Sequence, residues 1–310
     1  MNGTYEVTIY GQMGGKYEIT ITLGDVPLGC PVIIPVIKVL VMTIGCEGTS
    51  WGQYRNPCAV AMNVDNDIVS VDRSNKRLQI VTKEGICKKI LEFKQFETLF
   101  SPCDIAISDD NTYYTLDNNN KQVVVSDENG HVRRTFGNNE LKDPQDIAIS
   151  PSDGNVYVTD LDGPCVKIYT PCGKYLRSFG SKGKGRGEFD LPFGIVIGKL
   201  GMVFVADHWN KRIHVFNWAD QHLFSFVCTC EERTLAYQRK LSIENDKYIY
   251  VTTDHPSSLL KFEISGRFVC RIDKDEDGLD YPNGVALTDD VPCRVVVADR
   301  DNHCIKVFVQ

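Results

Sequence analysis

The amino-acid sequence predicts an all-β fold, a six-bladed β-propeller closed by an N-terminal strand. Three observations predict it. A strand–turn–strand pattern recurs six times, with its anchoring aspartates 43 to 47 positions apart. Each repeat holds four strand-like segments, except that the last one ends after three, and an unused strand-like segment precedes the first. Four strands in about 45 residues is the size of one propeller blade.

The recurring turn is clearest in VFVADHWNKRIHVF, residues 203–216, where alternating apolar residues flank Asp207 and Asn210. We interpret the aspartate as bonding turn amides and the asparagine as bending the backbone, because Asn and Gly tolerate left-handed conformations. Six copies of one turn cannot all be active sites, so a structural role is predicted. The predicted structural turn residues are Asp72, Asp117, Asp160, Asp207, Asp254, Asp299, Asn75, Asn210 and Asn302.

An earlier strand opens each repeat, behind a proline in five of the six copies. These strands are PCAVAM, PCDIAI, PQDIAI, PFGIVI and PNGVAL, while QRKLSI from Gln238 lacks the proline. A fourth strand closes each repeat, as in KYLRSFG ending at Gly180. The segment KVLVMTIG, residues 38–45, is expected to supply the fourth strand of the sixth blade, with Val41 buried. Closure of the ring removes open sheet edges.

Composition limits the class of protein. The 310 residues carry a net charge of −7, which argues against non-specific adhesion to nucleic acid or membrane. No signal peptide is evident, and the apolar run at 28–44 is too short and too interrupted to span a membrane. Twelve cysteines are scattered without a C-x-x-C pair. We predict reduced core thiols and a cytoplasmic location, with a secreted disulfide protein as the alternative.

Residues 183–216, GKGRGEFDLPFGIVIGKLGMVFVADHWNKRIHVF, resemble a nearly complete NHL repeat. GQYRNP at 52–57 and DNHCIKVF at 301–308 match the same pattern, and the resemblance covers residues 38–310. The signatures of WD repeats are missing. Residues 1–37 resemble the last strands of a filamin-type immunoglobulin repeat, so the predicted boundaries are 1–37 and 38–310.

A filamin repeat followed by an NHL propeller resembles the C-terminal half of TRIM-NHL proteins. In that family a RING domain, B-boxes and a coiled coil supply E3 ubiquitin-ligase activity and oligomerisation, so the resemblance implies ligase chemistry only for a longer parent. We therefore expect a non-catalytic recognition module for a protein partner or ubiquitination substrate. No cofactor, metal, membrane or small-molecule substrate is expected.

In a propeller of this topology, the second-to-third-strand loops and the loops between blades share one face, here called the rim. The rim is also expected to hold Tyr54, Lys76 and Lys240, although Tyr54 sits at a motif position that usually packs. The candidate binding residues are Trp51, Arg55, Arg73, Lys182, Lys184, Arg186, Phe193, His208, Trp209, Lys211, Tyr237, Arg239, Arg300 and His303.

Cations interleaved with aromatic rings suit phosphates and stacked bases, so single-stranded RNA is the alternative ligand. Some NHL propellers of the family bind RNA through this rim. Against RNA, residues 38–310 hold 33 Lys and Arg and 38 Asp and Glu. Acidic loops at 230–234 and 273–280 share the rim, and we therefore favour a protein partner.

An enzyme is the remaining alternative. His208, His255 and His303 follow turn aspartates in neighbouring repeats and could be drawn as a zinc site over the channel, as in propeller lyases. The glycine-rich run at 181–189 precedes a strand rather than a helix, so it does not have the context of a phosphate-binding loop.

Overall fold

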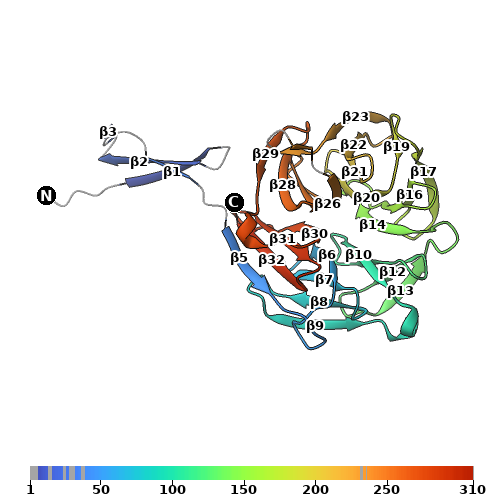
Figure 1. Cartoon of the computed structure of the whole chain (residues 1–310). Coiled ribbons are helices and arrows are strands. Elements are labelled where there is room, and N and C mark those ends of the chain that lie inside the picture. Colours follow the sequence, from blue (N-terminus) through green and yellow to red (C-terminus); the bar gives the residue numbers. More distant parts are fainter. Residues whose placement is uncertain are drawn as a thin grey trace.

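The computed structural model describes residues 6–12, 16–23, 26–27, 32–35, 39–230, 233–234 and 236–309. Six four-stranded antiparallel sheets stand radially around a central channel (Figure 1). The six innermost strands neighbour one another in a closed cycle, which makes the ring continuous. The predicted six-bladed propeller is confirmed.

Blades 1 to 5 follow the order of their strands in the chain, from the channel outward, whereas blade 6 takes its outermost strand from the N-terminal side of the ring. Blade 1 holds β6 (Pro57–Met62), β7 (Ile68–Asp72), β8 (Arg77–Val81) and β9 (Cys87–Glu92), and blade 2 holds β10 (Pro102–Ile107), β11 (Tyr113–Asp117), β12 (Gln122–Ser126) and β13 (Val132–Phe136). Blade 3 holds β14 (Pro144–Ile149), β15 (Val156–Asp160), β16 (Cys165–Tyr169) and β17 (Tyr175–Phe179).

The second half of the ring repeats this plan. Blade 4 holds β20 (Pro192–Ile197), β21 (Val203–Asp207), β22 (Arg212–Phe216) and β23 (His222–Val227), and blade 5 holds β26 (Ala236–Glu244), β27 (Tyr248–His255), β28 (Ser257–Glu263) and β29 (Phe268–Arg271). Blade 6 holds β30 (Pro282–Leu287), β31 (Arg294–Asp299), β32 (Cys304–Val309) and β5 (Val39–Ile44). Short elements lie between blades: η1 (Lys94–Leu99), β18 (Ser181–Lys182), β19 (Glu188–Phe189), β24 (Thr229–Cys230), β25 (Arg233–Thr234) and η2 (Asp275–Asp277).

The ring closes as predicted, because β5 pairs with β32 antiparallel in the register Ile44↔Ile305 and Val39↔Val309. The expectation that Val41 is buried is wrong. Side chains alternate across a strand, and the alternation in β5 leaves Val41 47% exposed, whereas Ile44 is 4% exposed and packs between blades 6 and 1.

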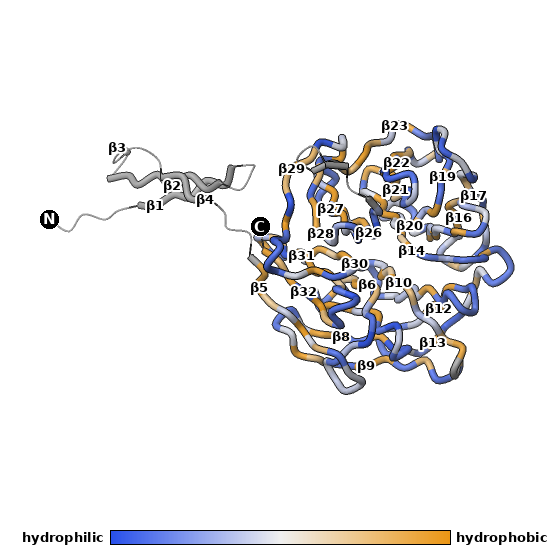
Figure 2. The backbone as a smooth tube through the Cα atoms, in the orientation of Figure 1, coloured by the Kyte–Doolittle hydropathy of each residue, from blue (hydrophilic) through white to orange (hydrophobic). Residues whose placement is uncertain are grey.

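The core lies between blades rather than at one centre. The second and third strands of the blades are almost completely buried, and the outer strand β17 is largely exposed. Six apolar clusters fill the interfaces, one between each pair of neighbouring blades. Apolar segments accordingly occupy the body of the ring and hydrophilic ones many of its loops (Figure 2).

Two glycines allow close approach of inner strands. A Cβ atom on Gly194 would lie 2.3 Å from the carbonyl oxygen of Arg239, and one on Gly284 would lie 2.7 Å from the Cα of Ala59. Any side chain at these positions would therefore push neighbouring blades apart.

Before the ring, β1 (Glu6–Gln12), β2 (Lys16–Leu23), β3 (Val26–Pro27) and β4 (Val32–Pro35) form one small sheet, in which β2 pairs with the other three. The filamin-type assignment of residues 1–37 stays a prediction.

The ten cysteines whose side chains are described are all free thiols. In the described part of the chain, no helix is long and apolar enough to cross a membrane.

Candidate binding surface

The turn aspartates tie two kinds of rim loop together. In blade 1, the Arg55 N–H donates to Asp72 Oδ1 at 2.8 Å, while Asn75 Nδ2 and Arg77 Nε each donate to Asp72 Oδ2 at 2.8 Å. Asn75 Nδ2 also donates to the carbonyl oxygen of Gly48 at 2.8 Å. The aspartate and the asparagine therefore hold the second-to-third-strand loop against the loop between blades.

The same arrangement recurs in blades 4 and 6. Asp207 Oδ2 accepts from Asn210 at 2.9 Å and from Arg212 at 3.0 Å, and Asp299 Oδ2 accepts from Asn302 at 2.8 Å. All six turn aspartates are buried. Their bonds are made within the chain, which agrees with a structural role. The expectation that the asparagine bends the backbone is wrong, because the left-handed residue of these turns is the next one, Lys76, Lys211 or His303.

The structure separates the candidate rim residues by exposure. Trp51 is 64% and Trp209 58% exposed, and Arg73, Tyr237, Arg300, Phe193 and His303 are half-buried. The guanidinium of Arg73 makes no hydrogen bond or ion pair with any described residue, whereas Arg300 Nε lies 3.4 Å from Asp301 Oδ1. The remaining exposed candidates are Arg55, Lys182, Lys184, Arg186 and Lys211.

Beneath these side chains, rings and guanidinium groups form a stacked layer over the channel. His208 lies between Phe193 and Tyr237, with ring centroids 4.6 Å and 4.7 Å away. The guanidinium of Arg239 lies 4.6 Å from the Phe193 ring centre and 4.2 Å from that of Tyr281. Such cation–π contacts hold planar groups in fixed positions.

Arg239 and His208 are both buried, so neither offers a free side chain to a ligand. Arg239 pairs with Asp254 at 2.7 Å. Burial lowers the pKa of His208, and its Nδ1 lies 3.1 Å from the carbonyl oxygen of Gln238. These residues form the floor of the rim rather than its contact surface.

Two residues expected at the rim lie elsewhere, and one residue of the rim was not expected. Tyr54 is fully buried and packs between blades 6 and 1, and Lys240 is buried in the channel. Tyr281, which sequence reasoning missed, stands between Arg239 and Arg300, 4.6 Å from the latter guanidinium. Its position directly before the strand-opening Pro282, equivalent to Tyr237, was the signal that could have found it.

Lys240 closes the channel below this layer. Its Nζ lies 2.9 Å from both Asp104 Oδ2 and Asp146 Oδ1. Burial and the neighbouring Asp104 hold the pKa of Asp146 well above its usual range. Asp104 and Asp146 are the third residues of β10 and β14, and Lys240 holds the matching position of β26. In the two blades next to blade 5, this position is Gly194 or Gly284.

The three histidines of the zinc alternative have other contacts. His208 stacks on Tyr237, whose ring centroid lies 5.8 Å from that of His255. His303 Nδ1 accepts a hydrogen bond from the Asn56 N–H at 3.1 Å. Within the described ranges, no group of three His, Cys, Asp or Glu residues is placed to hold a metal ion.

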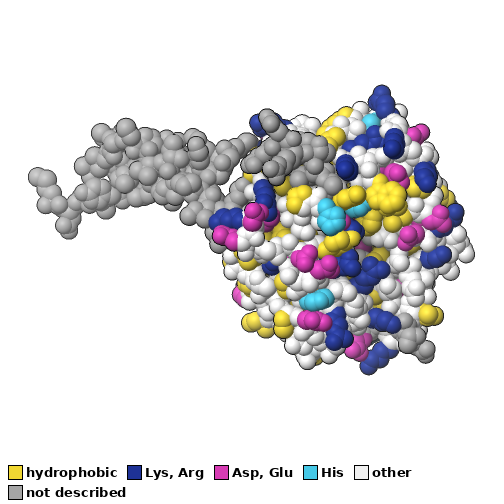
Figure 3. Space-filling view, viewed as in Figure 1, with side chains coloured by type: hydrophobic (Ala, Val, Ile, Leu, Met, Phe, Trp, Pro, Cys, Tyr) yellow, Lys and Arg dark blue, Asp and Glu magenta, His cyan; other side chains and the backbone are white. Residues whose placement is uncertain are grey.

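The rim carries mixed charge. The second-to-third-strand loops hold five Lys and Arg and two Asp. Beside them, the acidic loop at 273–280 is bound to the last of these loops, since Asn302 Nδ2 and the Asp301 N–H donate to Gly278 and Asp280 carbonyl oxygens. Basic, acidic, histidine and apolar side chains are interspersed on the face seen in Figure 3.

A ring of this kind, with satisfied turns and exposed loop side chains, defines a β-propeller binding module. No family model matches the chain. Protein brain tumor of Drosophila melanogaster is 26% identical over 183 residues, 59% of this chain and 13% of that protein. Protein lin-41 of Caenorhabditis elegans is 27% identical over 95 residues, and E3 ubiquitin-protein ligase TRIM71 of Rattus norvegicus is 42% identical over 50.

These three relatives are NHL-repeat TRIM proteins. The chain is accordingly similar to the NHL propellers of that family, which supports a binding module. The matches span 27% and 16% of this chain for lin-41 and TRIM71, and 8% and 6% of those proteins. Peptidyl-glycine alpha-amidating monooxygenase of Mus musculus is 33% identical over 86 residues, 25% of this chain and 9% of that protein.

Solved structures agree with the fold. A streptogramin B lyase has a TM-score of 0.61 at 12% identity, covering 87% of this chain and 99% of that one. A protein of unknown function from Bacteroides thetaiotaomicron has a TM-score of 0.67 at 12% identity, covering 98% and 87%. At this identity the likeness concerns the fold alone.

Proposed function

We propose that the rim docks a protein partner and that the chain is the non-catalytic recognition module of a TRIM-NHL-like E3 ubiquitin ligase. Similarity to three NHL-repeat TRIM proteins supports the class of module. The ligase chemistry and the identity of the ubiquitination substrate would belong to the longer parent. A cytoplasmic location fits the free thiols, because disulfides persist in oxidising compartments.

The observation that carries the proposal is that internal hydrogen bonds hold the rim turn of blade 4 in place while neighbouring side chains of the same turn stay exposed. Asp207 and Asn210 are bonded inside the chain, while Trp209 between them is 58% exposed and Lys211 is exposed as well. A buried network thus fixes the backbone of a loop whose adjacent side chains are exposed to solvent. Rigid presentation of an exposed aromatic residue and a cation is typical of binding hot spots.

A protein partner fits the rim better than RNA does, because the rim mixes charges. Asp275 and Glu276 of the acidic loop have side chains that are 93% and 75% exposed, although they also pair with Arg271 and Lys274. These carboxylates would repel a polyanionic backbone close to Arg300, whereas a protein surface can match positive and negative patches together. We expect acidic side chains of the partner opposite Arg73 and Lys211, and apolar ones opposite Trp209.

The double variant Trp209→Ala with Arg73→Glu tests this proposal. Trp and Arg hot spots cost about 2 kcal/mol or more when removed, so we expect at least a tenfold loss of affinity. The measurement is capture of a partner from cell extract, followed by titration of the purified partner. Since both side chains lie outside the turn networks, the melting temperature should stay within a few degrees.

A matched control carries Trp218→Ala with Lys174→Glu, which change an exposed tryptophan and an exposed lysine on the opposite face. The control should retain the partner. Full retention by the rim variant would contradict the proposal, and so would equal loss in the control.

A further inference from the structure

The face opposite the rim contains a cavity whose lining mixes aliphatic, polar and charged residues. A cavity of about 900 Å³ occupies the channel on that side of Lys240. Its lining runs from Asp104, Asp146 and Lys240 at one end to Lys199, Asn245 and Asp289 of the first-to-second-strand loops at the other. No residue of the rim loops lines it, so the cavity opens away from the surface proposed above.

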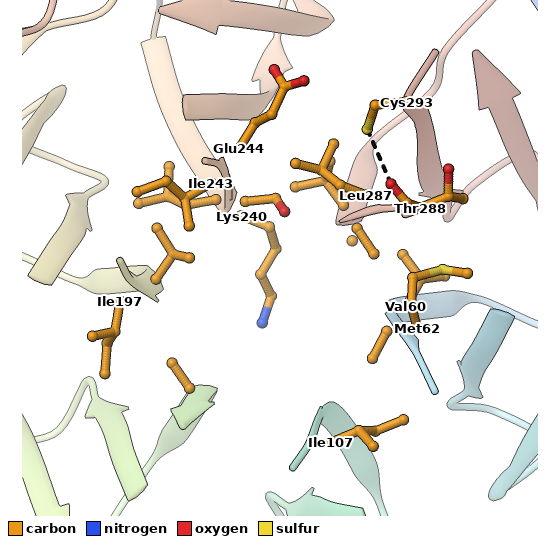
Figure 4. Close-up of a pocket in the computed structure, with 18 of the residues that line it drawn as sticks. Val60, Met62, Ile107, Ile197, Lys240, Ile243, Glu244, Leu287, Thr288 and Cys293 are labelled. Carbon is orange, nitrogen blue, oxygen red and sulfur yellow. Dashed lines mark hydrogen bonds between the residues drawn. The ribbon is translucent and has the colours of Figure 1, made fainter. Parts of the chain in front are cut away.

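Aliphatic side chains ring the cavity, one from each blade. They are the sixth residues of five inner strands and the matching residue of β26, and most of them are only partly buried. Figure 4 shows several of them arranged around the channel, with Lys240 extending between them. The ring consists of Met62, Ile107, Ile149, Ile197, Ile243 and Leu287. Desolvating such a ring favours an apolar occupant.

The floor of the cavity excludes a simple anionic ligand. Two buried lysines, Lys240 and Lys261, line the cavity. Asp104 and Asp146 each lie 2.9 Å from the Lys240 Nζ, and Glu244 Oε2 lies 3.0 Å from the Lys261 Nζ. The Lys240 Nζ also donates to the carbonyl oxygen of Gln145 at 3.1 Å. An acid with an aliphatic tail would therefore find both ammonium groups already neutralised, so the charge that selects a ligand must lie at the mouth.

The mouth is acidic. The first-to-second-strand loops that surround it hold eight Asp residues and two Lys residues, the reverse of the five cations and two acids in the second-to-third-strand loops of the rim. Asp65, Asp109 and Asp289 are exposed. Asp246 Oδ1 is buried and has no hydrogen-bond partner among the described residues. Charge complementarity at this face thus calls for a cationic partner.

The same loops also expose large apolar side chains. Val291 is 98% exposed, Leu200 75% and Val64 57%. They extend the apolar surface from the cavity out to the loop tips of blades 6, 4 and 1. Exposed apolar residues that lie around a cavity indicate a binding surface, whereas single exposed apolar residues scattered over a protein do not.

We propose that this face binds a basic peptide segment of a partner protein, whose large apolar side chain enters the ring formed by Ile107, Ile243 and their equivalents. Lysine or arginine residues on either side of that apolar side chain contact Asp109, Asp289 and neighbouring acids. The aliphatic ring within the cavity supplies affinity, and the acidic mouth selects basic over acidic segments. This surface is separate from the rim, so one module can hold two partners.

The probe is a labelled synthetic peptide with a central Leu-Phe pair flanked by lysines, titrated against the full chain by fluorescence anisotropy. A matched peptide has Gly-Gly in place of Leu-Phe. We expect the Leu-Phe peptide to bind at least tenfold more tightly than its match. Asp109→Lys with Asp289→Lys should weaken it at least tenfold, and Ile243→Gln should remove the preference for Leu-Phe.

Asp162→Lys is the control for charge, because Asp162 is an exposed aspartate in a rim loop. Asp162→Lys should change the affinity for the Leu-Phe peptide less than twofold. The rim variant, Trp209→Ala with Arg73→Glu, should also change it less than twofold, so failure of this proposal can be told apart from failure of the rim proposal. Equal binding of the two peptides would overturn the proposal, as would no binding at all or equal weakening by Asp162→Lys.

Discussion

Lys240 is the residue that joins opposite sides of the channel. It belongs to blade 5, while Asp104 and Asp146 belong to blades 2 and 3. Burial alone would push its pKa down, but the two carboxylates raise the pKa of Lys240 above its usual value, so the ammonium stays charged. The cluster fastens three blades together at the centre of the ring.

Lys240→Met should destabilise the chain by about 3–5 kcal/mol at neutral pH, because it leaves two buried carboxylates without a counter-ion. The loss should shrink as the pH falls, since protonated carboxyls carry no charge to leave unpaired. Urea unfolding of variant and wild type at several pH values measures it. Lys182→Met, on an exposed rim lysine, is the matched control, and a Lys240→Met chain as stable as wild type would contradict the role of the cluster.

The histidines of blade 4 predict a pH dependence of stability. Burial lowers the pKa of His208, and burial together with His214 and Arg186 lowers the pKa of His222. A histidine whose folded-state pKa is depressed contributes stability that is complete above its unfolded pKa of about 6.5 and is lost as the pH falls below that value.

Replacing His222 by Gln should therefore flatten the acid side of the stability curve. His222 Nε2 lies 2.8 Å from His214 Nδ1, and Gln retains a polar group there. The test compares urea unfolding of variant and wild type between pH 7.5 and 5. Parallel curves for the two proteins would show that His222 does not contribute to the dependence.

At the scale of single elements, β5 decides whether the ring closes. Ile44→Asp places a charge in the interface between blades 6 and 1 and should cost more than about 3 kcal/mol. Val41→Asp is the matched control in the same strand, because Val41 is exposed, and it should change stability by less than about 0.5 kcal/mol. Chemical denaturation measures both, and equal effects would contradict closure by this strand.

Most elements could be predicted because their signals are local. The spacing of Asp72 and Asn75 describes one turn, and alternation in a segment such as 203–207 describes one strand. The last repeat has only three strands, so its third strand needs an outer partner, and this need also predicted the pairing with β5. The face on which Val41 lies was not predictable, since a run of apolar residues does not reveal which side of the strand packs.

The binding surface was predictable only in part. Exposed Trp209 and Lys211 follow from their place in a turn. The burial of Arg239 and Lys240 does not, because it depends on contacts across the ring with Asp254, Asp104 and Asp146, and the fifth repeat departs from the pattern of the others. Pairings between residues far apart in the sequence leave no periodic signal.

For the whole molecule, the ring separates two faces of different charge. The second-to-third-strand loops are basic on balance and the first-to-second-strand loops acidic, although the chain as a whole carries a charge of −7. The body between them consists of buried strands and apolar interfaces. Because the faces are separated by this rigid body, the two partners proposed above would bind without direct competition.

The most direct measurement of rim recognition is fluorescence anisotropy with two probes, a pool of acidic peptides containing apolar residues and a randomised single-stranded RNA pool, at two salt concentrations. We predict binding of the peptides that Trp209→Ala with Arg73→Glu abolishes, and weak RNA binding. Sub-micromolar RNA binding, with a logarithmic salt slope of about −0.7 per phosphate contact, would contradict a rim built for a protein partner.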